Sequence, residues 1–181
     1  MACTDIDIYA DVKHCVGEVN LPGIREYVYY IRRKDIATWP TKGSQNLAAL
    51  VTLSSNFDLS TDKKWKKITL VPDANSFICE SQGNWGSKSF NNQVTVVHPG
   101  TKAEAAGLCE RLNNDDVVFL VPQRDGKYRL FGNEMFQANI DLKQESGAAA
   151  ASDSAQTTLE ISVTDLSPAP FYEGDIDYEG E

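Results

Sequence analysis

The sequence DVVFLVPQRDGKYRLFG, residues 116–132, carries the strongest structural signal in the chain. A continuous apolar run leads into a turn that contains Asp125 and Gly126, and the chain returns with Tyr128 and Leu130 alternating against a polar residue. Turn residues between two such runs are typical of a β-hairpin. We therefore expect a hairpin here.

Strand-like alternation also precedes this hairpin. In IREYVYYIRR, residues 24–33, apolar side chains fall on both faces, with Val28 and Tyr30 on one face and Tyr29 and Ile31 on the other. Such content favours a strand that is covered on both sides. Further patterns predict a strand at 47–53, a hairpin at 65–83 that turns at PDAN (72–75), a strand at 93–99, and strands near 135–144 and 157–165.

One helix is predicted, over residues 101–112. Thr101 and Glu104 form a T-x-x-E capping box, in which each side chain satisfies a backbone N–H group of the first turn. The apolar stripe of this helix consists of Ala105, Leu108, Cys109 and Leu112. Because a stripe at this spacing packs a helix on a sheet, Cys109 is interpreted as a small buried residue and not as a nucleophile.

These segments amount to about eight to ten strands and one helix, an arrangement that buries its apolar faces in packed layers. The fold class that we expect is mainly β with one helix. The strands would form a two-sheet antiparallel β-sandwich or flattened barrel, and the helix would cover an open side or end.

Length and charge limit the function classes. With 181 residues and 41% hydrophobic content, the chain is expected to form one globular domain. Its net charge of -9 argues against a general nucleic-acid binder or a binder of anionic membranes, because both need a basic face. No segment approaches the roughly 20 apolar residues of a membrane helix, and the first residues lack the pattern of a signal peptide. We expect a cytoplasmic site of synthesis and no membrane partner.

Catalytic, cofactor and metal sites are not predicted. The cysteines, Cys3, Cys15, Cys79 and Cys109, form no CxxC pair, which argues against a disulfide framework or a zinc site. His14 precedes Cys15, but adjacent strand residues point to opposite faces and pair poorly. We therefore expect a protein that is not an enzyme and binds no cofactor.

Charged residues gather in three short segments. Basic residues occur at Arg32, Arg33 and Lys34, and again at Lys63, Lys64, Lys66 and Lys67, around Trp65. Acidic residues close the sequence at Glu173, Asp175, Asp177, Glu179 and Glu181. One interpretation is that the lysines protect a strand edge and the acidic end is disordered. The other is that the acidic end contacts the basic residues of a neighbouring subunit.

The order of these segments resembles that of the tail-tube-like virion proteins of tailed phages that infect Bacteroidetes. The resemblance covers residues 24–172 and includes ESQGNWGSKSFNNQVTVVHPG (80–100), NNDDVVFLVPQRDGKYRLFG (113–132), SGAAAASDSAQTTLEIS (146–162) and PAPFY (168–172). It implies a tail-tube-like β-sandwich, which we place at 24–166 with the helix at 101–112. We expect an N-terminal arm at 1–23 before this domain and an acidic C-terminal extension at 167–181 after it.

The resemblance also implies a function without catalysis, as a ring of the tail tube or of the neck in the virion. The expected partners are copies of the same chain, in a hexamer or dodecamer, and adjacent portal, neck or tail ring proteins. Double-stranded DNA would pass through the ring without specific binding, since an acidic wall does not hold a polyanion by counterion release.

In such an assembly, the small residues at 146–155 are interpreted as an arm that buries surface against another subunit. Ala and Ser lose little side-chain entropy when they become ordered. The candidate assembly contacts are Arg32, Arg33, Lys34, Lys63, Lys64, Lys66, Lys67, Ser146, Gly147, Ala148, Ala149, Ala150, Ala151, Ser152, Asp153, Glu173, Asp175 and Asp177.

A second reading is a carbohydrate- or receptor-binding β-sandwich module of a phage tail, in which Trp39, Trp65 and Trp85 stack on sugars. These three tryptophans lie in separate segments, and no sequence pattern brings them onto one face.

Overall fold

The computed structural model describes residues 8–148 and 153–180. The strands are β1 (Tyr27–Arg32), β2 (Ile36–Thr38), β3 (Thr52–Leu53), β4 (Asp58–Leu59), β5 (Lys66–Thr69), β6 (Ser76–Gln82), β7 (Ser89–Pro99), β8 (Val117–Pro122), β9 (Tyr128–Phe131), β10 (Asn139–Glu145), β11 (Gln156–Asp165) and β12 (Phe171–Tyr172). The helices are α1 (Ala103–Leu112) and the short 3-10 helices η1 (Arg33–Asp35) and η2 (Ala49–Val51).

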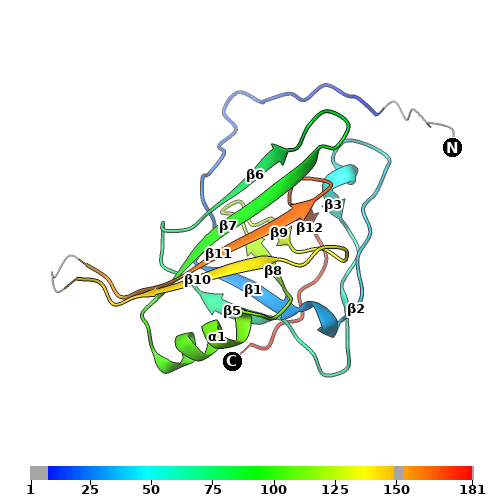
Figure 1. Cartoon of the computed structure of the whole chain (residues 1–181). Coiled ribbons are helices and arrows are strands. Elements are labelled where there is room, and N and C mark those ends of the chain that lie inside the picture. The colour runs from blue at the N-terminus through cyan, green and yellow to red at the C-terminus, as the bar shows by residue number, and fades with distance from the viewer. Residues whose placement is uncertain (1–7, 149–152, 181) are drawn as a thin grey trace.

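Two sheets pack face to face, as the fold class predicted (Figure 1). One has six strands in the order β3-β12-β9-β8-β1-β5, and the other has four in the order β10-β11-β7-β6. A separate two-stranded sheet, β2-β4, packs against the outer face of the six-stranded sheet through Ile36 and Leu59. The pairings within the sheets are antiparallel except that of β12 with β3. The molecule is therefore mainly β, with α1 near one end of the sandwich (Figure 1).

The predicted hairpin at 116–132 is confirmed as β8 and β9. Phe119 pairs with Phe131, and the strands are joined through a turn in which the Gly126 N–H donates to the Gln123 carbonyl at 3.0 Å. Gly126 has φ of +95°, a conformation that most other residues adopt only with strain. A turn followed by a left-handed glycine is a common three-residue hairpin connection.

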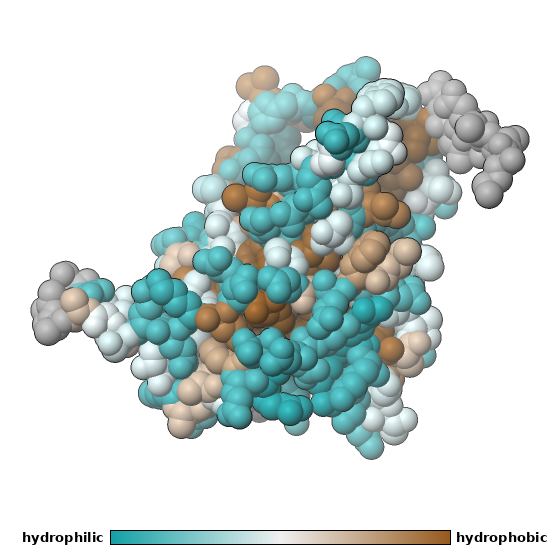
Figure 2. Space-filling model, viewed as in Figure 1, coloured by the Kyte–Doolittle hydropathy of each residue, from teal (hydrophilic) through white to brown (hydrophobic). Residues whose placement is uncertain are grey.

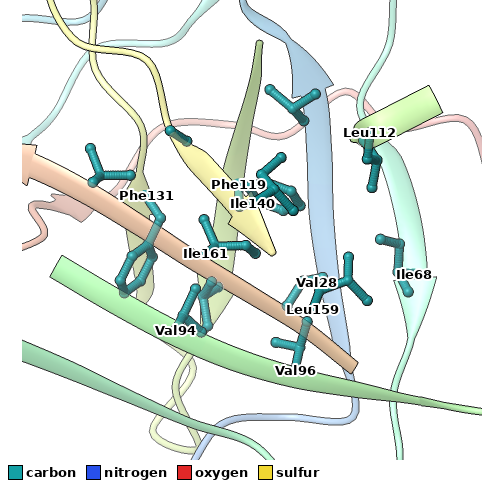
Figure 3. Packing of buried hydrophobic residues seen from close by; sticks show 14 of the residues in the cluster. Val28, Ile68, Val94, Val96, Leu112, Phe119, Phe131, Ile140, Leu159 and Ile161 are labelled. Carbon is teal, nitrogen blue, oxygen red and sulfur yellow. The ribbon is translucent and has the colours of Figure 1, made fainter. Parts of the chain in front are cut away.

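The inner core, between the two large sheets, is apolar (Figure 3). Its central residues are Val28, Ile68, Phe119 and Phe131 from the six-stranded sheet, Val94, Val96, Ile140, Leu159 and Ile161 from the four-stranded sheet, and Leu112 from α1. Alternate residues of each strand point into it, so burying them removes apolar area from water on both sheets at once.

An outer core lies on the opposite face of the six-stranded sheet. It joins Tyr29, Ile31, Leu53, Val118, Leu120, Leu130 and Tyr172 to Ile36, Phe57 and Trp65. Every residue of β8 is buried, because this strand contributes to both cores. Strand β1 also contributes to both cores, with Val28 in the inner core and Tyr29 and Ile31 in the outer core. It is therefore covered on both sides, as the sequence predicted.

The hairpin predicted at 65–83 is wrong. β5 pairs with β1 in one sheet, and β6 pairs with β7 in the other, so the chain crosses between the sheets here. The buried Asn75 fixes the crossing, since its side chain donates to the Val71 carbonyl at 2.6 Å and accepts from the Val97 N–H at 2.8 Å. Alternation located both strands correctly but could not show that their partners lie elsewhere.

Two further local predictions need correction. The segment 47–53 forms η2 and the two-residue β3, because the Asn46 side chain accepts from the Ala49 N–H at 2.9 Å and starts a helical turn. The capping box does not form. Helix α1 begins two residues later than expected, which leaves Lys102 and not Thr101 in the N-cap position.

The C-terminal extension contributes to the fold. Ala169 and Tyr172 are buried, and β12 lies between β9 and β3, so the sandwich continues past residue 166. At the other end, residues 9–23 are exposed, and Ile24 is the first buried residue of the described chain.

Replacing Phe119, which is fully buried in the inner core, by Ala removes a large side chain that its neighbours cannot fully replace. We expect this change to lower the free energy of unfolding by about 3–5 kcal/mol. The exposed Trp85 is the control, and Trp85→Ala should change this free energy by less than about 0.5 kcal/mol. Urea denaturation measures both, and equal effects would contradict the assigned core.

Candidate functional site

Four lysines surround the start of β5. Lys63, Lys64, Lys66 and Lys67 are all exposed, whereas Trp65 between them is only 1% exposed and packs against Phe57 in the outer core. Lys67 lies over the Tyr27 ring at 4.7 Å. Trp65 fills the outer core, whereas the lysines on either side of it stay in solvent because β5 is the edge strand of the six-stranded sheet. We call residues 63–67 the basic edge.

The acidic end of the chain lies directly on this edge. The Trp65 N–H donates to the Asp177 carbonyl at 2.9 Å, and the Glu179 N–H donates to the Trp65 carbonyl at 3.0 Å. Trp65 and Tyr178 thereby form a parallel β-bridge. We call residues 176–180 the acidic strap.

Side chains repeat the pairing that the backbone makes. Lys64 Nζ lies 3.1 Å from Asp177 Oδ1, and Lys66 Nζ lies 2.6 Å from Glu179 Oε2. The Tyr178 ring lies 5.2 Å from that of Tyr29. The strap thus contacts the edge through backbone bonds, two ion pairs and an aromatic contact.

The expected contact between the acidic end and a neighbouring subunit is made within the chain in this structure. The preceding residues direct the strap to its own edge. The Glu173 N–H donates to the Leu53 carbonyl at 3.0 Å, and Asp175 donates its N–H to Asn56 Oδ1 at 2.9 Å. The Tyr172 hydroxyl also donates to the Asp175 carbonyl at 2.8 Å. Of the predicted acidic contacts, only Asp177 reaches the lysines, and Glu179 is the second partner.

The charges of one ion pair shift each other's titration. The hydrogen bond from Lys66 lowers the pKa of Glu179 below its ordinary value of 4.5, and the same bond raises the pKa of Lys66 above 10.5. Both shifts favour the charged pair. The ion pair therefore stabilises the closed strap fully at pH values between 4.5 and 10.5.

The first basic segment divides between two places. Arg32 bonds Asp35, with Nε 2.8 Å from Oδ2, and lines a cavity of about 550 Å³ together with Lys63, Lys64 and Lys66. Arg111 of α1 and Glu179 of the strap line the same cavity. Arg33 instead pairs with Asp116 at 3.0 Å, and Lys34 is exposed nearby. The fold brings only Arg32 of this segment to the basic edge.

The small-residue segment lies at the end of a long hairpin. The last strand pair of β10 and β11 is Glu145 with Gln156, and the described residues 146–148 and 153–155 continue beyond it in a narrow projection from the body (Figure 1 and Figure 2). Its described residues are Ser146, Gly147, Ala148, Asp153, Ser154 and Ala155, whereas Ala149, Ala150, Ala151 and Ser152 lie outside the described residues. We call residues 146–155 the arm.

Contacts within the described part of the arm are local. Asp153 accepts from the N–H groups of Ala148 and Ser154, the latter at 3.0 Å. At the base, the Gly100 N–H donates to the Ala155 carbonyl at 2.9 Å. The side chains of Ser146, Ala148, Asp153 and Ser154 are exposed. The described part of the arm therefore makes local hydrogen bonds but leaves most of its side chains exposed.

The three tryptophans do not form one aromatic platform. Trp65 is buried, Trp39 packs its ring 5.5 Å from that of Phe57, and Trp85 is 96% exposed. Stacking on a sugar requires an exposed ring face. Trp85 is the tryptophan that best meets this requirement.

The histidines and the described cysteines, Cys15, Cys79 and Cys109, show no catalytic grouping, and Cys3 lies outside the described residues. His98 Nδ1 lies 2.7 Å from the Thr69 carbonyl, and His14 lies beside Glu18 in an exposed pair. Burial raises the pKa of the Cys109 thiol, which disfavours the reactive thiolate. Within residues 8–148 and 153–180, no three His, Cys, Asp or Glu side chains are grouped to hold a metal ion.

Among the described helices, none has the length and apolar content needed to cross a membrane. Neither a protein-family model, nor a curated protein, nor a solved structure matches this chain.

Sequence reasoning missed Arg111 and the aromatic contact between Tyr178 and Tyr29. Arg111 lies on the polar side of a helix, where a charge is ordinary, and carried no signal. The opposite charges of the lysines and the acidic end predicted that the two would make contact. They did not show whether the contact would form within one chain or between two chains.

Lowering the pH should weaken the closed strap, because protonation of Glu179 removes one of its contacts. Because the pKa of Glu179 is depressed in the closed state, its contribution is present above pH 4.5 and is lost as the pH falls below that value. We expect the protection of the Glu179 amide against hydrogen exchange to decrease there, as measured by NMR. The Leu120 amide in β8 is the control and should stay protected. Unchanged Glu179 protection on acidification would contradict this role of the ion pair.

Proposed function

We propose that the protein is a structural virion protein that forms a ring of a phage tail tube or neck, through which genomic DNA passes during ejection. The observation that carries this proposal is the described part of the arm, residues 146–148 and 153–155, which projects from the sandwich (Figure 1). These residues are exposed, except for the half-buried Gly147. The order of segments along the sequence, which resembles tail-tube-like virion proteins, supports the same function.

An arm of this kind gains stability only from surface on another molecule. Its exposed side chains include small residues that lose little conformational entropy on docking, and its backbone carries hydrogen-bonding groups. A copy of the same chain is the partner that every subunit of a ring has available. Adjacent portal, neck or tail ring proteins are the further partners that this function implies.

The ends of the two sheets offer a second kind of contact. β6 and β10 are the outer strands of the four-stranded sheet, and outer strands present unpaired backbone groups. Edge-to-edge pairing between copies would extend a sheet around a ring. The net charge of -9 suits the channel of such a ring, since a wall without excess basic charge does not retain DNA phosphates.

A non-catalytic carbohydrate- or receptor-binding module of a phage tail is the second candidate. The observation that favours it is Trp85, which is 96% exposed near the turn between β6 and β7. Binding of the monomer to a glycan array, lost in Trp85→Ala, would support this candidate over the ring.

Electron microscopy of the purified protein tests the ring. We expect rings or short tubes, with hexamers or dodecamers as the assembly states. A chain that stays monomeric at high concentration and is absent from purified viral particles would overturn the proposal.

Shortening the arm tests which segment drives assembly. Deleting residues 147–154 leaves Ser146 and Ala155 as a two-residue loop between the paired Glu145 and Gln156. Changing these two residues to Asn and Gly supplies the preferred turn. We expect this variant to unfold at the urea concentration of the unchanged protein but to form no rings.

The control for this deletion keeps the full arm and carries only Ser146→Asn and Ala155→Gly. It should form rings as the unchanged protein does. Rings of normal size from the shortened variant would show that the arm is not an assembly contact.

A further inference from the structure

Ile176 at the start of the strap is half-buried against the outer core, and the remaining contacts of the strap are exposed. In the pair of Lys64 with Asp177, the side chains are 49% and 68% exposed, and in the pair of Lys66 with Glu179 they are 58% and 66% exposed. Ion pairs at this exposure contribute little stability because water screens them. Tyr178 is itself 41% exposed. The strap is therefore expected to open far more often than the sandwich unfolds.

What the strap covers is a complete docking site for a peptide. The Trp65 N–H and carbonyl point outward beside β5 and receive a parallel segment by strand addition. Lys64 and Lys66 flank this backbone position and select acidic side chains, and the Tyr29 ring receives the aromatic residue between them. These groups remain on the domain when the strap leaves.

We propose that this site also binds the acidic strap of a second copy of the chain, so that neighbouring subunits exchange straps. The same contacts then form between two chains, with Asp177 and Glu179 of one on Lys64 and Lys66 of the other. This inference deepens the proposed assembly by naming one of its contacts.

Proximity decides which chain supplies the strap. In an isolated subunit, the chain's own strap has the advantage of an intramolecular contact, whose effective concentration is in the millimolar range. Subunits held side by side by other surfaces present their straps at a similar effective concentration. Exchange then costs little free energy, because each bond broken within a chain is replaced by the same bond between chains.

Disulfide trapping tests the exchange. In a background with Cys3, Cys15, Cys79 and Cys109 changed to Ser, one variant carries Lys66→Cys and another carries Glu179→Cys. These positions follow the bridged pair of Trp65 and Tyr178 on their two segments. Mixing the variants under mild oxidation should give a disulfide-linked dimer that contains one chain of each.

Two controls fix the meaning of the dimer. A single chain with both cysteines should form the bond internally, which confirms that the positions can be joined. In the second control, the Glu179→Cys chain is mixed with a chain that carries Lys127→Cys in place of Lys66→Cys. The thiol then lies elsewhere on the surface, and little mixed dimer should form. If the double variant closes but the mixture gives no more dimer than the Lys127→Cys control, the exchange is wrong.

The second ion pair provides a test of specificity. Adding Asp177→Lys to the Glu179→Cys chain should lower the yield of mixed dimer about fivefold, since an exposed attraction becomes a repulsion. Adding Lys64→Glu to the other chain should restore the yield. If neither change alters the yield of mixed dimer, the dimer arises from random collision and the proposal is overturned.

The outcome is separable from that of the proposed ring. Rings without mixed dimers would leave the ring in place and reject the exchange. Mixed dimers that respond to the charge changes without any rings would support the exchange and reject the ring.

Discussion

A strand that is apolar on both faces has to be covered twice, and β8 imposes this requirement on the molecule. All of its residues are buried, with Phe119 in the inner core and Leu120 in the outer core. The four-stranded sheet covers the first face. The second face needs another layer, which the chain builds from Ile36, Phe57 and Trp65 and from Ile176, which follows β12. The position of the acidic strap follows from this need, because Tyr172 holds the chain there.

Periodicity predicted what depends on neighbours along the chain. The hairpin of β8 and β9 and the double burial of β1 were predictable because the alternation and the turn residues are local. The crossing at Asn75 was not, because pairing partners are chosen by the packing of distant strands. The capping box at Thr101 was not a safe prediction either, because helix ends are uncertain by one or two residues, and Lys102 takes the N-cap position without a side-chain hydrogen bond.

The candidate site shows the same division. Complementary charge connected Lys64 and Lys66 to the acidic end, but charge alone does not tell a contact within a chain from one between chains. That choice depends on the hydrogen bonds of Glu173 and Asp175 to Leu53 and Asn56, which sequence patterns do not reveal. The arm was located correctly as a hairpin loop, and its role in assembly stays a prediction. Arg111 carried no signal, because a charged residue on a helix surface is ordinary.

Sharing one sheet between two cores has a consequence for how the protein loses its structure. Neither core can come apart alone, because opening either one leaves an apolar face of β1 and β8 in water. The two cores therefore behave as a single cooperative unit, although they lie on opposite sides of a sheet. A substitution that loosens the packing of the outer core, around Trp65 or Tyr172, therefore also lowers the stability of the inner core, because both cores share the same sheet.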